Sequence, residues 1–280
     1  MIESLSESKS VDGVVALGSM GEFYAVNRTE FERIAKTIIS AASGRLTTVI
    51  GCSFQNLGEC LYRTKYAEDT GFDGAMIMPP YYLNVNSEEA LKHYQAVDRT
   101  SRKIQIMAYN FPPASKFNIN PEFWKKLVTL DSVKAVKESN GDLFHITRVL
   151  SEFGDRVNVF AGSEAWLLPM SCLGAKGVVS IFGSSLPEYV RRFYDACFGK
   201  NISVSARMHK SFVEASWFID LYNEVAWLKD LNEICGWKVG APRPPYSRLS
   251  RKQHELLKAW VIKVRLKNRS LGESSRVYSD

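Results

Sequence analysis

The chain has 280 residues, of which 45% are hydrophobic and 24% are charged, a composition that is ordinary for a globular protein large enough to bury a sizeable core. It contains no uninterrupted run of about 18 apolar residues, the length that spans a bilayer, and its first 13 residues lack the basic-then-apolar pattern of a signal peptide. Five cysteines without CxxC or metal-ligand spacing predict free thiols in a reducing compartment. We therefore expect a cytoplasmic protein with no membrane partner.

The formal net charge of +6 is concentrated near the C-terminus, because residues 241–270 carry nine Lys or Arg against one acid, Glu255. Such a tail can bind nucleic acid through its phosphates. Alternatively, it is a solvated helix with one apolar face turned inward. The residues at that helical spacing are Leu256, Leu257, Trp260, Val261 and Val264. The spacing favours the helix, and we expect no nucleic-acid partner.

Seven short apolar runs rich in β-branched residues predict strands. In chain order they lie at 13–19, 47–53, 74–80, 105–110, 133–139, 157–163 and 177–182. The stretches between them, such as 29–42 and 57–71, have an apolar residue every three or four positions and predict helices. Successive strand–helix units predict an α/β fold with an all-parallel sheet, most commonly closed as a (β/α)₈ TIM barrel. A doubly wound open sheet is the alternative, but the first strand is not followed by the GxGxxG turn typical of that fold.

The predicted strands end near residue 200. Residues 203–236 predict a pair of helices, and the proline-rich segment 241–250 connects them to a last helix. We therefore expect a TIM-barrel catalytic domain over 1–200 and a C-terminal helical region over 201–280.

A lysine interrupts one strand that otherwise reads as buried, "DSVKAVKESNG" at 131–141. Side chains alternate along a strand, which places Val133, Ala135 and Lys137 on one face. Tyr109 ends the preceding predicted strand, and neighbouring parallel strands lie about 4.8 Å apart, so the tyrosine hydroxyl and the lysine amine can meet at the carboxyl end of a barrel. An amine that loses its proton in an apolar pocket attacks a ketone to form a Schiff base, and a nearby tyrosine can relay the protons.

Each of these signals also has a plainer interpretation. Lys137 fits half of an ion pair or a last residue before solvent, and Tyr109 fits a core tyrosine with a satisfied hydroxyl. The loop "GSMGE" at 18–22 is either a simple glycine turn or a set of amides that cradles a carboxylate. Tyr81 and Tyr82 are typical of an aromatic interface patch. The four histidines all fall in helical stretches, so we expect neither a histidine base nor a metal site.

In this order, the residues resemble the dihydrodipicolinate synthase / N-acetylneuraminate lyase family of pyruvate-dependent class I aldolases. The matching motifs are "GSMGE" at 18–22, "PPYYLN" at 79–84, "YNFP" at 109–112, "VKAVKES" at 133–139, "GSE" at 162–164 and "GAKGVVS" at 174–180. The resemblance implies a lyase without a cofactor or metal. It also implies pyruvate and an aldehyde as substrates, and a homodimer or homotetramer as the assembly.

The resemblance assigns a role to each site residue. It makes Lys137 the Schiff-base lysine, Tyr109 the proton-relay tyrosine and Ser19 the hydroxyl that links the relay. The amides of Ser19 and Met20 would hold the pyruvate carboxylate, and Tyr82 would reach into the site of a neighbouring subunit. The remaining residues expected to bind substrate are Gly162, Glu164 and Val179, the last through its backbone carbonyl.

Two positions depart from the family pattern. Met20 stands where the family usually has a small hydroxyl residue, so one side-chain hydrogen bond to the carboxylate is lost while the amides remain. Ala114 stands where dihydrodipicolinate synthases have an arginine that binds the carboxylate of the aldehyde substrate. Lys116 can supply a charge there but not the planar bidentate fork. "YNFP" followed by small residues is more similar to the sugar-acid aldolases of the family.

The family also has a strand and most of a helix before the strand predicted at 13–19, where this sequence has about ten residues. The resemblance therefore implies a barrel that lacks its first strand. Either the start codon is placed too late, or the chain is a truncated paralogue with an open barrel edge.

The function that we expect is that of a Schiff-base-forming lyase that cleaves or forms a C–C bond between pyruvate and an aldehyde. The substrate would be of the 2-keto-3-deoxy sugar acid or N-acetylneuraminate type. Dihydrodipicolinate synthase (4-hydroxy-tetrahydrodipicolinate synthase) activity and a catalytically silent paralogue are the alternatives. The sequence leaves open the physiological direction and the choice between an aldolase and a dehydratase.

Overall fold

The protein is described by a computed structural model over residues 1–221 and 223–274, with side chains over 1–217 and 223–265. Its centre is one parallel sheet in which the strands follow one another in chain order. They are β1 (Gly13–Ala16), β2 (Thr47–Gly51), β3 (Gly74–Ile77), β4 (Gln105–Asn110), β5 (Val133–Glu138), β6 (Asn158–Ala161) and β7 (Gly177–Val178). All seven predicted strands are therefore present, each within its predicted range. A doubly wound sheet would reverse its strand order, so this sequential order excludes the alternative.

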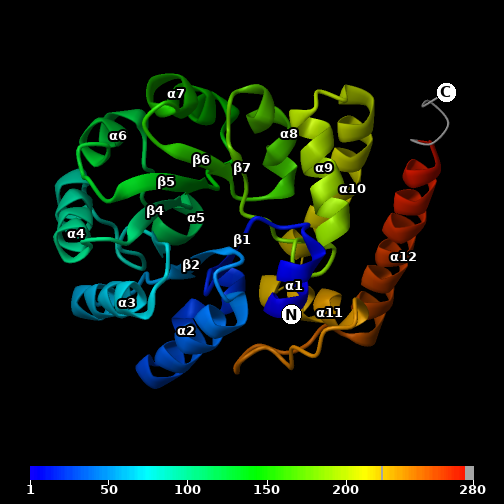
Figure 1. Ribbon diagram of the computed structural model, residues 1–280, viewed down its shortest axis with the longest axis horizontal. Helices are drawn as coiled ribbons and strands as arrows, with labels where there is room; N and C mark the ends of the chain where they lie inside the picture. The colour runs from blue at the N-terminus through cyan, green and yellow to red at the C-terminus, as the bar shows by residue number, and fades with distance from the viewer. Residues whose placement is uncertain (222, 275–280) are drawn as a thin grey trace.

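Helices alternate with the strands and cover the outside of the sheet. The first part of the chain forms α1 (Ile2–Ser8), η1 (Ser19–Gly21), η2 (Phe23–Ala25), α2 (Arg28–Ala42), α3 (Leu57–Thr70) and α4 (Ser87–Thr100). The second part forms α5 (Pro112–Ser115), α6 (Pro121–Leu127), α7 (Leu143–Phe153), α8 (Glu164–Cys172) and α9 (Pro187–Phe198). Figure 1 shows the strands as an inner arc with α2, α3, α4, α6 and α7 around it. This is the layout of a (β/α) barrel wall.

Asparagine side chains begin several of these helices. Asn27, Asn56 and Asn86 each accept a hydrogen bond from a backbone amide in the first turn of α2, α3 and α4. Glu30 and Glu89 complete a reciprocal capping box in α2 and α4. Each such cap satisfies amides that have no partner within the helix, which fixes where the strand-to-helix loops end.

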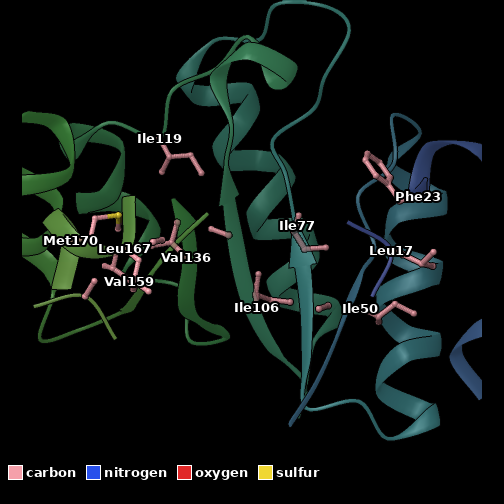
Figure 2. Close-up of a cluster of buried hydrophobic side chains, with 14 of the residues drawn as sticks. Leu17, Phe23, Ile50, Ile77, Ile106, Ile119, Val136, Val159, Leu167 and Met170 are labelled. Carbon is pink, nitrogen blue, oxygen red and sulfur yellow. The ribbon is translucent and has the colours of Figure 1, made fainter. Parts of the chain in front are cut away.

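The main hydrophobic core lies between the sheet and the outer helices. Figure 2 shows Ile50, Ile77, Ile106, Val136 and Val159 pointing from successive strands into this layer. The opposite faces of the same strands form a second set of contacts, which we call the lumen cluster. Its buried members are Val49, Met76, Met78, Met107 and Tyr109, and its partly buried members are Val15, Tyr81, Phe111, Ala135, Phe160 and Val179. The alternation of side chains thus covers both faces of the arc of strands with apolar side chains.

One expectation about β5 is wrong. Ala135 and Lys137 share the lumen face as predicted, but Val133 packs in the outer core. The register of β4 and β5 shifts between Ile106 and Met107, which pair with Val133 and Ala135 respectively. A β-bulge therefore inserts Lys134 and turns Val133 to the other face. Lys134 itself is exposed.

The chain after residue 200 is helical, as predicted. It forms α10 (Ile202–Leu221), α11 (Glu224–Ile234) and α12 (Arg251–Ser274), the red helix at the side of the barrel in Figure 1. Leu257, Trp260, Val261 and Val264 are buried, whereas the predicted inward-facing Leu256 is 43% exposed. In the part of the chain that the structure describes, no helix combines the length and the apolar character that a membrane span requires.

Part of the basic charge in this region is used within the molecule. Arg243, Arg248 and Lys263 form ion pairs with acids of α2, α11 and α10, namely Glu30, Glu233 and Glu214. These contacts attach the C-terminal region to the barrel and to itself. Only Lys263 of the three lies on α12, and its ion pair together with the buried apolar face of that helix supports the interpretation of the tail as a packed helix.

Candidate active site

Lys137 and Tyr109 lie side by side at the carboxyl ends of β5 and β4. The two residues are direct partners in the strand register, and the Lys137 Nζ lies 4.4 Å from the centroid of the Tyr109 ring. Tyr109 is buried and Lys137 is partly buried. The period-two argument from the sequence thus correctly brings a lysine amine and a tyrosine together on the lumen face. An ammonium over an aromatic face is an attractive arrangement, and the loss of its proton leaves a nucleophile.

The surroundings of this pair are apolar. Phe111 stacks on Tyr109 with ring centroids 5.8 Å apart and planes inclined by 13°, and Phe160 is the register partner of Lys137 on β6. Tyr81 packs on the lumen cluster and contacts Phe23 edge to face. The amine of the partly buried Lys137 thus has apolar neighbours, and electrostatic interactions are stronger in such surroundings than in bulk water.

The loop after β1 brings Ser19 and Met20 to the same end of the sheet. Leu17 takes a left-handed backbone conformation with φ 51°, and its carbonyl oxygen lies so close to Gly51 that a Cβ there would approach it to 1.9 Å. Only glycine permits this approach of the loop to β2. Within the described residues, the amides of Ser19 and Met20 donate no hydrogen bond to a protein acceptor. They are therefore available to an external carboxylate.

The predicted relay residues Ser19, Tyr109 and Tyr82 do not form one hydrogen-bonded chain among the described residues. Among the described residues, no hydrogen bond links Ser19 to Tyr109. Tyr82 is 75% exposed, lies outside the lumen cluster and has φ 82°. Its carbonyl oxygen accepts a hydrogen bond of 2.9 Å from the Lys116 ammonium. The tyrosine ring is thus presented to the outside of this chain.

The three remaining predicted residues lie at the ends of β6 and β7. Gly162 lies against Ser139, where a Cβ would come within 1.9 Å of the hydroxyl oxygen, and its amide donates to the Glu138 carbonyl at 2.8 Å. Val179 packs on the lumen cluster, and its amide donates to the Ala161 carbonyl. Gly162 therefore permits the close contact between the ends of β5 and β6.

Glu164 is completely buried. Its carboxylate accepts hydrogen bonds from the Ser180 hydroxyl and from the amides of Ile181 and Phe182. Burial raises the pKa of this carboxyl above its usual value, against the effect of these hydrogen bonds. The contacts tie the start of α8 to the loop after β7, so in this structure Glu164 shapes the loop beside Val179.

A buried polar cluster lies behind the pair and was not predicted. Asn110 and Glu138, both fully buried, follow Tyr109 and Lys137 directly and point to the other face of the sheet. The Asn110 amide nitrogen lies 2.9 Å and 3.0 Å from the two Glu138 carboxylate oxygens, and 3.1 Å from Asn118 Oδ1. Asn140 donates its backbone amide to Glu138 at 2.8 Å.

His145 completes this cluster. All four histidines lie in helices, as predicted, but His145 on α7 is buried with its Nε2 3.3 Å from both Glu138 Oε2 and Asn110 Nδ2. The two hydrogens of the Asn110 amide are directed to Asn118 and Glu138, so Nε2 carries a hydrogen that it donates to the carboxylate. The residues lie far apart in the sequence, and the only signal that could have found them is the "YN" and "KE" pairing of the two motifs.

The comparisons with known proteins agree with this architecture. The family model described as the Dihydrodipicolinate synthetase family matches residues 3–263, so the chain belongs to that family. Its members are pyruvate-dependent lyases of the class I aldolase type, and the chain is one of these enzymes.

Individual relatives are distant. The 4-hydroxy-tetrahydrodipicolinate synthase of Archaeoglobus fulgidus is 27% identical over 250 residues, which cover 89% of this chain and 86% of that protein. The structure of the 4-hydroxy-tetrahydrodipicolinate synthase from Methylacidiphilum fumariolicum matches with a TM-score of 0.90 at 21% identity, over 97% of this chain and 91% of that one. YagE, an E. coli prophage protein of the dihydrodipicolinic acid synthase family in complex with pyruvate, gives 0.88 at 23% identity, over 94% and 91%. These two structures confirm the predicted TIM-barrel fold.

The buried cluster generates a prediction about stability. Replacing Glu138 by Ala leaves the Asn110, Asn140 and His145 donors without their acceptor, and we expect the free energy of unfolding to fall by about 3 kcal/mol or more. Denaturant unfolding followed by circular dichroism measures this change. Glu138→Gln, which keeps the shape but not the charge, should fall between Glu138→Ala and the unmodified protein.

Glu122→Ala is the matched control, because Glu122 is 67% exposed and pairs with Lys125 on the surface of α6. Its unfolding midpoint should stay close to that of the unmodified protein. Equal midpoints for Glu138→Ala and the control would show that the cluster does not stabilise the fold.

Proposed function

We propose that Lys137 is the Schiff-base lysine of this enzyme and that Tyr109 relays its protons. The observation that carries the proposal is the contact of the Lys137 amine with the Tyr109 ring inside the apolar lumen cluster. The free amine attacks C2 of pyruvate, and the carbinolamine loses water to give the imine. Loss of a proton from C3 then gives an enamine, which adds to the carbonyl carbon of an aldehyde, and hydrolysis releases the product. The reverse sequence cleaves the same bond.

The other residues of the site support these steps. The free amides of Ser19 and Met20 would hold the pyruvate carboxylate, and the Ser19 hydroxyl would connect the tyrosine to solvent or to a second tyrosine. Gly162, Glu164 and Val179 would shape the pocket on its other side, with Glu164 acting through the loop that it holds. No metal or cofactor takes part in this scheme.

The acceptor is proposed to be an aldehyde that yields a 2-keto-3-deoxy sugar acid or an acylated amino-sugar acid. Ala114 offers no charge to a second carboxylate, and the Lys116 ammonium already donates to the Tyr82 carbonyl. A site without an arginine fork binds a substrate carboxylate less tightly. The absence of an arginine at position 114 argues against aspartate semialdehyde as the substrate.

A second candidate is 4-hydroxy-tetrahydrodipicolinate synthase activity, because relatives at 25–29% identity carry that name. Identity at this level fixes the family chemistry more firmly than the substrate, since specificity depends on a few pocket contacts. The catalytically silent paralogue is the outcome that remains if neither substrate class reacts.

The assembly is proposed to be a homodimer or homotetramer in the cytoplasm. Tyr82 and Leu83 are exposed by 75% and 63% beside the site, and an aromatic residue on a surface loop is well placed to enter a neighbouring subunit. The five cysteines are all free, which supports a reducing compartment.

The covalent step gives the first test of this function. Incubation with pyruvate and borohydride should add about 72 Da, the mass of pyruvate less one oxygen, because the imine is reduced to a secondary amine. Peptide mapping by mass spectrometry should place the adduct on Lys137 and not on Lys134. Lys137→Arg should abolish trapping, and Tyr109→Phe should only slow it, since the relay is lost but the nucleophile stays. A folded sample that pyruvate and other 2-oxo acids leave unlabelled would support the silent paralogue.

The substrate class has its own test. Turnover of aspartate semialdehyde should fall roughly two orders of magnitude below that of 2-keto-3-deoxy sugar acids or acylated amino-sugar acids, because a charge-assisted bidentate contact is missing. Coupled assays on a small panel measure the ratio of kcat/KM values. A clear preference for aspartate semialdehyde would overturn the assignment in favour of the second candidate.

The assembly is tested by light scattering at micromolar protein concentration. We expect the mass of a dimer or a tetramer, and Tyr82→Ala should shift the distribution towards the monomer because a central aromatic contact is removed. Phe144→Ala, at an aromatic residue of α7 that is also 75% exposed, serves as the control. A monomer for the unmodified protein would leave Tyr82 without its proposed role.

A further inference from the structure

The loop that carries Ser19 and Met20 ends on a buried acid. Glu22 has φ 56°, and only 5% of the residue is exposed. Its amide donates to the Ser19 carbonyl at 3.1 Å, which closes the loop. Its carboxylate is therefore buried only two residues along the chain from Met20, and a buried carboxylate needs a cation and hydrogen-bond donors.

Both partners of this carboxylate come from the C-terminal helical region. The Lys229 ammonium, on α11, lies 2.7 Å from Glu22 Oε2, and the Arg243 backbone amide donates to Oε1 at 2.7 Å. Lys229 also donates to the Ala241 carbonyl at 2.8 Å. One lysine thus joins the loop, α11 and the segment between α11 and α12.

The same segment makes further contacts with the chain that follows the loop. The Arg243 guanidinium binds Glu30 through two hydrogen bonds of 2.9 Å and 3.1 Å, and the Ala25 carbonyl at 3.2 Å. The ring of Tyr246 lies edge to face against Tyr24 at 6.3 Å. Figure 1 shows this segment in orange between α11 and α12.

These contacts hold the residue that ends the loop whose amides would bind the pyruvate carboxylate. Glu22 is two residues from Met20, so a pyruvate carboxylate on the loop amides would lie near a second negative charge. Lys229 balances that charge, and its hydrogen bond fixes the left-handed turn that orients the amides. Without the Lys229 ammonium, either Glu22 would have to move out into water or its buried charge would stay unpaired.

We propose that Lys229 is a positioning residue through which the C-terminal helical region sets the affinity for pyruvate. Lys229 does not touch the substrate; it holds Glu22, and Glu22 holds the loop. This inference rests on the proposed function, because it takes the amides of Ser19 and Met20 as the carboxylate site. Lys229 would thus control the carboxylate site although it lies more than 200 positions away in the sequence.

The test measures the rate of borohydride trapping as a function of pyruvate concentration, so it needs no knowledge of the aldehyde. Lys229→Met should raise the half-saturating pyruvate concentration by about tenfold or more, the effect of losing one charge-assisted hydrogen bond. The maximal trapping rate should change by less than about twofold, because the nucleophile and its relay are intact. Lys229→Arg restores a cation and should recover most of the affinity.

Lys263→Met is the matched control. Lys263 also pairs with an acid across helices of the C-terminal region, Glu214 at 2.6 Å, but it has no contact with the loop among the described residues. Its half-saturating concentration should equal that of the unmodified protein. If Lys229→Met folds poorly, the double variant Glu22→Gln with Lys229→Met removes the unpaired charge; it should fold and still show the raised pyruvate requirement.

The outcomes separate the two proposals. If borohydride traps no pyruvate on the unmodified protein at any pyruvate concentration, the proposed function is wrong. The positioning role, which rests on it, is then wrong as well. Normal trapping by the unmodified protein with an unchanged half-saturating concentration in folded Lys229→Met leaves the function intact and overturns the positioning role. A fall in the maximal rate alone would also overturn it, because Lys229 would then act on the chemistry and not on pyruvate binding.

Discussion

The parallel pairing of β4 with β5 sets the register in which Tyr109 faces Lys137, and the other features of the site depend on it. On the lumen face this register brings the Lys137 amine onto the Tyr109 ring, the pair that we propose as nucleophile and proton relay. On the opposite face it joins Asn110 to the Glu138 carboxylate, which gathers three donors in the protein interior. A slip by one residue would exchange the two faces and destroy both arrangements. The buried cluster thus makes this register costly to lose.

The sequence was sufficient to predict the strands, their parallel arrangement and the meeting of Tyr109 with Lys137. These depend on local signals, since β-branched runs mark strands and the alternation of side chains sorts the faces. The position of Val133 could not be predicted in this way. Its face depends on a bulge opposite Ile106 and Met107, and a bulge is a property of two paired strands.

Contacts between distant segments were the other features that the sequence did not reveal. Nothing in the spacing connects Glu22 with Lys229, or Glu138 with His145, because each pair is brought together only by the packing of helices against the sheet and its loops. Glu164 illustrates the same difficulty. Its motif indicates a site residue, but the structure buries its carboxylate against the loop after β7, where it accepts hydrogen bonds from the amides of Ile181 and Phe182. The C-terminal helical region, in turn, holds the loop after β1 as well as covering the barrel.

A crystal structure of the protein soaked in pyruvate tests the role of Lys137 most directly. We expect continuous electron density between the Lys137 Nζ and C2 of pyruvate, with the carboxylate on the amides of Ser19 and Met20 and the Tyr109 hydroxyl beside the new bond. Pyruvate bound beside an unmodified Lys137, or joined to a different lysine, would contradict the assignment of the nucleophile.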